Sequence, residues 1–301
     1  MLAAALRGSP ASTGLPSRRT ATLTLTVSFA VLLAALLHAS WNAMIKGSRD
    51  VLLDTAGIVL GAGVVALPFL IFVAPPAAAA WPYIGASLTI HLAYYYLMVN
   101  AYRVGDLTLV YPLMRGVAPL ITGLAGIVLL RELPSTVAWV GMLLISFGVF
   151  ALAYRTLGHA PSRAAIGFAL ANAAVIAAYT LVDGKGARIS GNAWGYIAWL
   201  FVLDALPFSA YMLARHRAHF VAYLRANPER GLIGGGLSAA AYAIAVWAMT
   251  QAPVALVASL RETSVLFATL IGARLLKEHL SPRRWAGVLA VVVGVIALKA
   301  G

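Results

Sequence analysis

Two arginines and one glutamate interrupt stretches of the chain that are otherwise apolar. Arg115 and Arg261 each lie about eight residues into such a stretch, about 12 Å along a helix axis. In a membrane helix that depth is near mid-bilayer, where an unpartnered charge is costly, so we interpret both as functional. Glu262 follows Arg261 and points about 100° away from it around a helix. We therefore expect Glu262 to pair with Arg115 or Arg261 until protonation or a substrate carboxylate breaks the pair. A permanent, purely structural ion pair is the alternative.

Aromatic and titratable side chains at helical spacing form a second set of candidates. His38, Trp41 and Asn42 share one helix face, and His91 and Tyr95 share another. Aromatic rings offer apolar and cation-π contacts, and histidine titrates near neutral pH, so these faces could line an amphipathic cavity. Interfacial anchoring or packing is the alternative for each ring taken singly. The candidate cavity and binding residues are Arg115, Arg261, Glu262, His38, Trp41, Asn42, His91, Tyr95, Tyr111, Tyr179, Tyr242 and Trp247, and the candidates for proton coupling are Glu262, Asp204 and His38.

The motifs of common enzymes are missing from the sequence. There is no Gly-x-Ser-x-Gly, no His-Glu-x-x-His and no Gly-Lys-Ser or Gly-Lys-Thr phosphate loop. Cysteine is absent, which excludes disulfides, thiolate metal sites and cysteine nucleophiles. We therefore expect no enzymatic activity, no direct ATP hydrolysis, no cofactor and no bound metal.

The composition requires a lipid environment. Hydrophobic residues make up 62% of the 301 residues, charged residues only 10%, and the mean hydropathy is +0.89. A helix needs about 20 apolar residues to cross a bilayer, so the chain has room for about ten spans and no large soluble domain. Each span should be helical, because lipid cannot satisfy open backbone groups. The expected spans are residues 21–45, 51–73, 81–102, 107–130, 136–154, 164–182, 193–213, 231–250, 253–275 and 282–298.

The formal net charge of +13 does not indicate nucleic acid as a partner. Its arginines lie mainly in short stretches between apolar runs, where they anchor loops at lipid headgroups. Residues 1–20 read as a disordered basic tail. The alternative, a secretory or twin-arginine signal, fits less well because the following apolar run is long and further spans come directly after it.

The sequence contains an internal duplication. A shift of 146 positions (261 − 115) superposes Arg115 on Arg261, and roughly fifteen of about 38 positions match without a gap. The matches include Glu132 with Glu278, Trp139 with Trp285, Gly141 with Gly287 and Gly148 with Gly294. We therefore expect a first unit at 21–155 and a second at 164–299. Because five spans is an odd number, the two units must be inserted oppositely, which predicts an inverted repeat with a substrate site near the midplane.

These segments resemble the EamA-type transporters of the drug/metabolite transporter superfamily over nearly all of residues 25–299. The resemblance rests on the following residues: His38 to Asn42 with Lys46, Tyr111 to Arg115 with Pro119, Arg131 to Leu133, and Lys277 with Glu278. It implies ten helices, cytoplasmic termini, a central cavity, alternating access, and export of amino acids or movement of other small solutes. One departure is that Arg115 is followed by Pro119 whereas Arg261 is followed by Val265, so the halves are not chemically equivalent.

The distribution of basic residues conflicts with that orientation. With both termini inside, cytoplasmic segments hold 7 Lys or Arg and the opposite side holds 13. Taken literally, the positive-inside rule favours the reverse orientation. We keep the family topology as the expectation, since inverted halves give mixed charge signals.

The function expected from all of this is secondary transport in a multi-pass membrane protein, with the bacterial-type inner membrane as the expected location. Two arginines against one glutamate favour a small zwitterion or anion, such as an amino acid, exported by alternating access in exchange for protons. A sugar, nucleotide-sugar or drug transporter of the same fold stays open, and a channel or membrane-embedded enzyme is a more distant alternative. The expected partners are the solute and the lipid bilayer. A homodimer is left open.

Overall fold

The computed structural model describes residues 23–46, 48, 50–105, 107–153, 162–276 and 281–301, and every regular element among them is a helix. The expected tail at 1–20 and the Lys277-Glu278 motif lie outside these residues. The elements are α1 (Leu25–Lys46), α2 (Val51–Ala66), α3 (Phe69–Phe72), η1 (Ala78–Ala80), α4 (Trp81–Val104), α5 (Leu107–Leu129), α6 (Thr136–Ala153), α7 (Arg163–Ile189), α8 (Ala193–Arg215), α9 (Arg217–Ala226), α10 (Pro228–Gln251), α11 (Val254–Arg261), α12 (Ser264–Leu276) and α13 (Pro282–Ala300).

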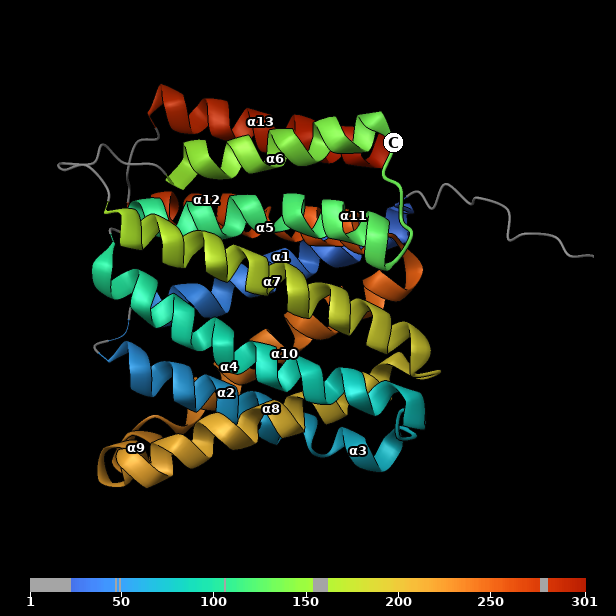
Figure 1. Cartoon of the computed structure of the whole chain (residues 1–301). Coiled ribbons are helices and arrows are strands. Elements are labelled where there is room, and N and C mark those ends of the chain that lie inside the picture. The colour runs from blue at the N-terminus through green and yellow to red at the C-terminus, as the bar shows by residue number, and fades with distance from the viewer. Residues whose placement is uncertain (1–22, 47, 49, 106, 154–161, 277–280) are drawn as a thin grey trace, which may run out of the picture.

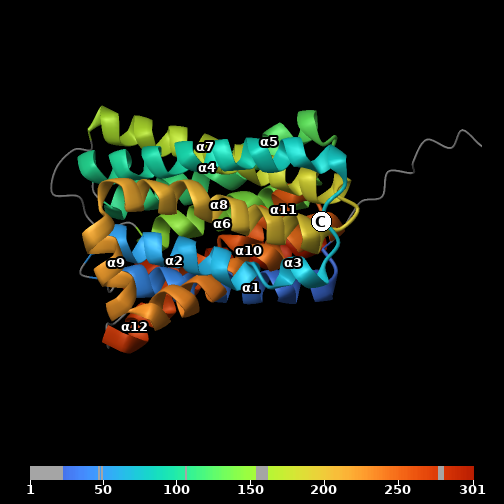
Figure 2. The same cartoon turned by 90° about the horizontal axis from the view of Figure 1, so that it is seen from below.

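The long helices run side by side along one common direction, as Figures 1 and 2 show from two sides. Within the described residues, seven segments are long and apolar enough to cross a membrane by length and composition. Helices α4 and α13 fall outside this set although they are long, because α4 carries several tyrosines and a histidine, and α13 carries basic residues at both ends. The seven segments are Leu25–Ile45, Val51–Phe72, Leu109–Leu129, Arg163–Ile189, Ala193–Arg215, Pro228–Gln251 and Val254–Ile271.

Large apolar side chains cover the outside of the bundle. Phe29, Ile71, Phe72 and Val128 are between 68% and 83% exposed. A soluble monomer rarely exposes apolar surface on this scale, whereas acyl chains solvate it. The exterior therefore agrees with the composition: the protein is an integral, multi-pass membrane protein.

Helices α6 and α13 pack closely along one edge of the bundle (Figure 1). Glycines permit this approach, since a Cβ atom on Gly141 would lie 2.8 Å from the Gly294 carbonyl oxygen. A Cβ atom on Gly148 would lie equally close, at 2.8 Å, to the Gly287 carbonyl oxygen. The 146-residue shift pairs Gly141 with Gly287 and Gly148 with Gly294, so exchanging the two segments converts one contact into the other. The two helices cross antiparallel at equivalent positions.

Other helix pairs are also exchanged by the 146-residue shift, which relates α1 to α7, α4 to α10, and α5 to α11 and α12. Helix α4 packs on α7, and correspondingly α10 packs on α1. Helix α5 packs on α7, and correspondingly α11 and α12 pack on α1. The pattern has an exception, because α2 packs along much of α10 whereas α4 has few contacts with α8. The two segments of the chain are therefore arranged similarly but not identically.

The helices differ from the expected spans in several details. The second span is interrupted at Leu67 and Pro68, before α3 begins at Phe69, since proline cannot donate the next helical hydrogen bond. The ninth is interrupted after Arg261. The connection before α10 contains the short helix α9, which sequence periodicity did not predict.

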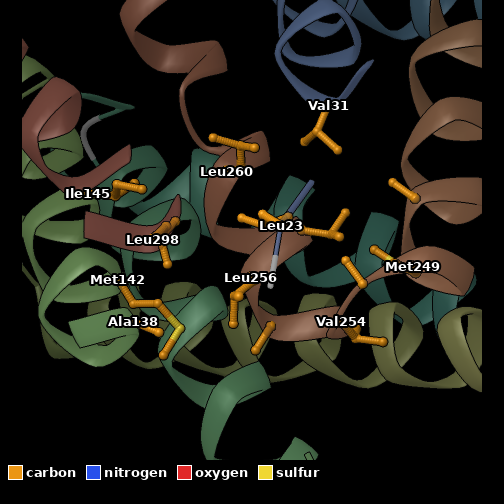
Figure 3. Packing of buried hydrophobic residues seen from close by; sticks show 14 of the residues in the cluster. Leu23, Val31, Ala138, Met142, Ile145, Met249, Val254, Leu256, Leu260 and Leu298 are labelled. Atoms are coloured by element: carbon orange, nitrogen blue, oxygen red, sulfur yellow. The ribbon is translucent and has the colours of Figure 1, made fainter. Parts of the chain in front are cut away.

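An apolar core surrounds α11. Leu256 and Leu260 of α11 pack with Val31, Met142 and Leu298, which come from α1, α6 and α13 (Figure 3). All these side chains are at most 2% exposed. This packing fixes the end of α11, where the charged residues begin.

Candidate functional site

Arg115 of α5 and Glu262, directly after α11, form a buried ion pair. The Arg115 Nε atom lies 2.9 Å from the Glu262 Oε2 atom, and the two residues are 8% and 4% exposed. Among the described residues, neither of these two atoms nor Arg115 Nη2 has an aligned hydrogen-bond partner. The pair is therefore held by charge, and part of the guanidinium remains able to donate to another group. Of the two partners expected for Glu262, the structure has Arg115.

The break between α11 and α12 positions Glu262. Its N–H donates to the Ser259 carbonyl, and the Thr263 N–H donates to the Leu260 carbonyl. Both bonds join residues three apart, so the backbone forms a tighter 3₁₀-type turn here. The Thr263 hydroxyl also donates to the Leu260 carbonyl, at 2.7 Å. Hydroxyl side chains that compete for backbone carbonyls favour such irregular turns. The expectation that residues 253–275 form one continuous helix was wrong at this point.

Arg261 has an aromatic partner. Its guanidinium carbon lies 5.2 Å from the centre of the Tyr242 ring, a cation-π distance, and the residue is 9% exposed. Among the described residues, no carboxylate lies within ion-pair distance of Arg261. The cation is thus buried and only partly compensated.

Asp183 of α7 accepts hydrogen bonds from two tyrosine hydroxyls. Tyr196 donates its hydroxyl to Asp183 Oδ1 at 2.8 Å, and Tyr242 donates a short hydrogen bond to Oδ2. Asp183 is fully buried. The expected span ends at 182, but helix α7 continues to Ile189, so Asp183 lies inside the helix. The Lys185 ammonium lies 5.8 Å from the Tyr83 ring centre.

His91 of α4 lies beside Asp204 of α8. Its Nδ1 atom is 3.7 Å from Asp204 Oδ1 and 3.3 Å from the Ser87 hydroxyl. The His91 ring stacks on Tyr179, with 4.6 Å between ring centres, and meets Tyr242 edge-on at 6.4 Å. His91 therefore contacts three other expected candidates: Asp204, Tyr179 and Tyr242.

Tyr94 and Tyr95 also lie on this side of α4. Tyr94 meets Tyr95 and Tyr179 edge-on, and Tyr95 stacks on Phe208 of α8, with 5.4 Å between ring centres. Tyr94 therefore packs inside the bundle, whereas Tyr102 is 37% exposed.

The three candidates on α1, His38, Trp41 and Asn42, make different kinds of contact. His38 lies close enough to Arg115 and Arg261 to interact with both charges. Its ring meets Trp41 edge-on at 5.1 Å. Asn42, in contrast, donates its amide to the His38 carbonyl at 2.8 Å, so its polar group is used within α1.

Tyr111 and Trp247 pack against the apolar core around α11. Among the candidates, the structure pairs Arg115 with Glu262 and joins a second group through ring, ion and hydrogen-bond contacts: Arg261, His91, Tyr95, Tyr179, Tyr242 and Asp204, with Asp183, Tyr94 and Tyr196 as additions.

Two further ion pairs tie helix ends together. At one end of the bundle, Arg188 Nη1 lies 2.6 Å from Glu132 Oε1, while Arg188 also donates to the Met249 and Ala252 carbonyls. Glu132 Oε2 in turn accepts the Val254 N–H at 2.8 Å. These contacts join the ends of α5, α7 and α10 to the start of α11.

At the opposite end, Arg230 of α10 lies 2.8 Å from Asp54 of α2 and donates to the Met44 carbonyl of α1. Asp54 is only 2% exposed. Arg230 is therefore the partner of a buried acid.

Together these features define an integral membrane protein with charged side chains gathered at membrane depth. Residues 163–299, from α7 to α13, match the EamA-like transporter family, which confirms the resemblance found in the sequence. No curated protein matches the chain. One solved structure, described only as "Crystal structure of protein", is 17% identical with a TM-score of 0.67, and the similarity covers 90% of this chain and 94% of that one. At this identity the likeness shows the fold alone.

Proposed function

We propose that the chain is a secondary transporter that exports small metabolites carrying a carboxylate, such as amino acids, in exchange for protons. In this proposal it has ten spans in two oppositely inserted units, 21–155 and 164–299. The sequence duplication, the reciprocal glycine contacts of α6 with α13 and the similar helix pairings support this architecture.

The observation that carries the proposal is the buried group of Arg115, Arg261 and Glu262. Two cations and one anion leave a local excess of positive charge. In a low-dielectric interior, an uncompensated cation strongly favours an incoming anion. A solute carboxylate would bind at Arg261, where Tyr242 already offers one apolar face.

Glu262 is the proposed link to protons. When it is ionised it holds Arg115, and when it takes up a proton the attraction between them weakens. A proton entering from outside would therefore free Arg115 as the solute leaves. Asp204 and His38 remain further candidates for the same role.

The test uses the full-length protein in proteoliposomes preloaded with labelled amino acids and with a labelled sugar. We expect efflux of an amino acid, faster when the outside is acid and slowed by a protonophore. Arg261→Gln should lower this efflux at least about tenfold, since a charged contact in a buried site is lost. Arg225→Gln, at an exposed position of α9, is the matched control and should transport normally.

Glu262→Gln separates coupling from binding. The amide imitates the protonated carboxyl, so efflux should continue but lose its dependence on outside pH. An unchanged pH dependence would remove Glu262 as the proton carrier. Sugar efflux that is indifferent to Arg261→Gln would refute the proposed substrate class, and flux that never concentrates a solute would indicate a channel.

A further inference from the structure

The buried charges form two poles of opposite sign. Around Arg115 and Arg261 the excess is positive, because Glu262 is the one acid among them. Around His91 the excess is negative: Asp204 Oδ1 lies 3.7 Å from the His91 Nδ1 atom, and Asp183 accepts the hydroxyl of Tyr242, whose ring meets His91 edge-on. The ring of Tyr242 lies between the poles.

Asp204 is the more exposed of the two acids at the negative pole. Asp183 is fully buried and accepts two tyrosine hydroxyls, so its oxygens are already used. The Asp204 side chain is 19% exposed, and its contact with His91, at 3.7 Å, is too long for a hydrogen bond. Among the described residues, no lysine or arginine lies within ion-pair distance of Asp204.

The surroundings of Asp204 suit an ammonium group. His91 stacks on Tyr179, and Tyr95, one turn after His91 on α4, stacks on Phe208, one turn after Asp204 on α8. A carboxylate flanked by aromatic faces combines charge attraction with cation-π contact. Asp204 itself lies in the middle of α8, where an acid without a cation is unfavourable.

The distance between the poles limits the solute. Arg261 lies 5.2 Å from the Tyr242 ring, that ring 6.4 Å from the His91 ring, and His91 3.7 Å from Asp204. Laid end to end, with about 1 Å more from the His91 ring centre to its Nδ1 atom, these steps allow at most roughly 16 Å between the guanidinium and the carboxylate, and each solute contact takes up about 4 Å. The two charges of a solute that reaches both poles can then be up to roughly 8 Å apart, well beyond the ~2.5 Å between the carboxylate and ammonium of an α-amino acid.

We propose that Asp204, with His91, Tyr95 and Tyr179, binds a terminal ammonium group of a solute whose carboxylate lies at Arg261. The substrate class is then carboxylates with an amine at the far end of a chain of about five carbon atoms, which includes amino acids with an aminoalkyl side chain. This inference rests on the proposed function, since it places the carboxylate at Arg261.

The test compares L-lysine with L-norleucine, which has a similar side-chain length but lacks the terminal amine. Binding to the purified full-length protein in lipid nanodiscs is measured by calorimetry. The wild-type protein should bind lysine at least about tenfold more tightly. Asp204→Asn should remove this preference while keeping norleucine affinity, and Asp204→Glu, which keeps the charge, should retain much of it. Glu229→Gln, an exposed acid of α10, is the control and should match the wild-type protein.

The outcomes separate the two proposals. Equal binding of lysine and norleucine by the wild-type protein overturns the ammonium site and leaves the carboxylate site intact, provided that Arg261→Gln weakens both ligands. The ammonium site is likewise overturned if Asp204→Asn keeps the preference for lysine. If neither ligand binds, or Arg261→Gln changes nothing, the carboxylate site fails and the ammonium site fails with it.

Discussion

Neutralising one member of the Arg115–Glu262 pair should destabilise the protein more than neutralising both. The atoms Nε and Oε2 are 2.9 Å apart and the residues are at most 8% exposed. With about 4 Å between the charge centres and an effective dielectric constant near 20, the attraction is about 4 kcal/mol. Removing one charge loses that attraction and leaves the other charge buried, which costs about 3–5 kcal/mol.

The assay is a double-mutant cycle on thermal stability in one detergent. Arg115→Gln and Glu262→Gln should each lower the unfolding midpoint by about 5–10 °C, using the usual relation between free energy and midpoint. The double variant carries two neutral amides in place of two charges, so it should unfold well above the temperature that additive effects give. The expected coupling energy is about 2–4 kcal/mol.

A second cycle controls for the substitutions themselves. Arg217→Gln and Glu229→Gln alter exposed residues of α9 and α10 that form no ion pair with each other, so their small effects should add. If the Arg115 and Glu262 effects add in the same way, the two side chains do not interact as the structure has them, and α5 and α11 do not share a charged site.

Two further predictions concern the helix contacts around the site. A Cβ atom on Gly61 would overlap the Gly231 carbonyl oxygen, so Gly61→Ala should separate α2 from α10 and lower the unfolding midpoint by several degrees. Gly85→Ala is the control, because a Cβ atom there meets nothing within 4 Å. Equal midpoints for the two variants would contradict the close packing of α2 on α10. Glu132→Gln should break the 2.6 Å contact with Arg188 and release the N–H of Val254. Protease cleavage between α10 and α11 should then increase without a change in expression level. Unchanged cleavage would show that the contact does not hold these helix ends together.

Some of the structure could be predicted because the bilayer imposes strict rules. A helical, multi-pass chain follows from composition, since lipid excludes other backbone arrangements. The contact of Glu262 with Arg115 follows from the same logic, because an acid and a base at membrane depth each need a partner and few are present. His91 and Asp204 were found as candidates for the same reason.

Other parts could not be predicted because they depend on neighbours distant in sequence. The expected span ends at 182, directly before Asp183, since an acid near the end of an apolar run is usually solvated or paired. Its hydroxyl donors, Tyr196 and Tyr242, come from α8 and α10. One signal was available: Tyr179 and Asp183 are four residues apart and share a helix face. The break at Glu262 depends on local hydroxyl bonds that helical periodicity does not report.

Helix α10 connects the site mechanically to both ends of the bundle. Near its start, Arg230 holds Asp54 of α2, and at its end the carbonyl of Met249 accepts from Arg188. Between them, Tyr242 contacts Arg261 and Asp183 at once. A rigid helix cannot shift one end without moving the ring in its middle, and interfaces between packed helices change between discrete arrangements rather than bending continuously. Breaking either end pair should therefore shift the Tyr242 ring, which lies between the positive pole and the negative one.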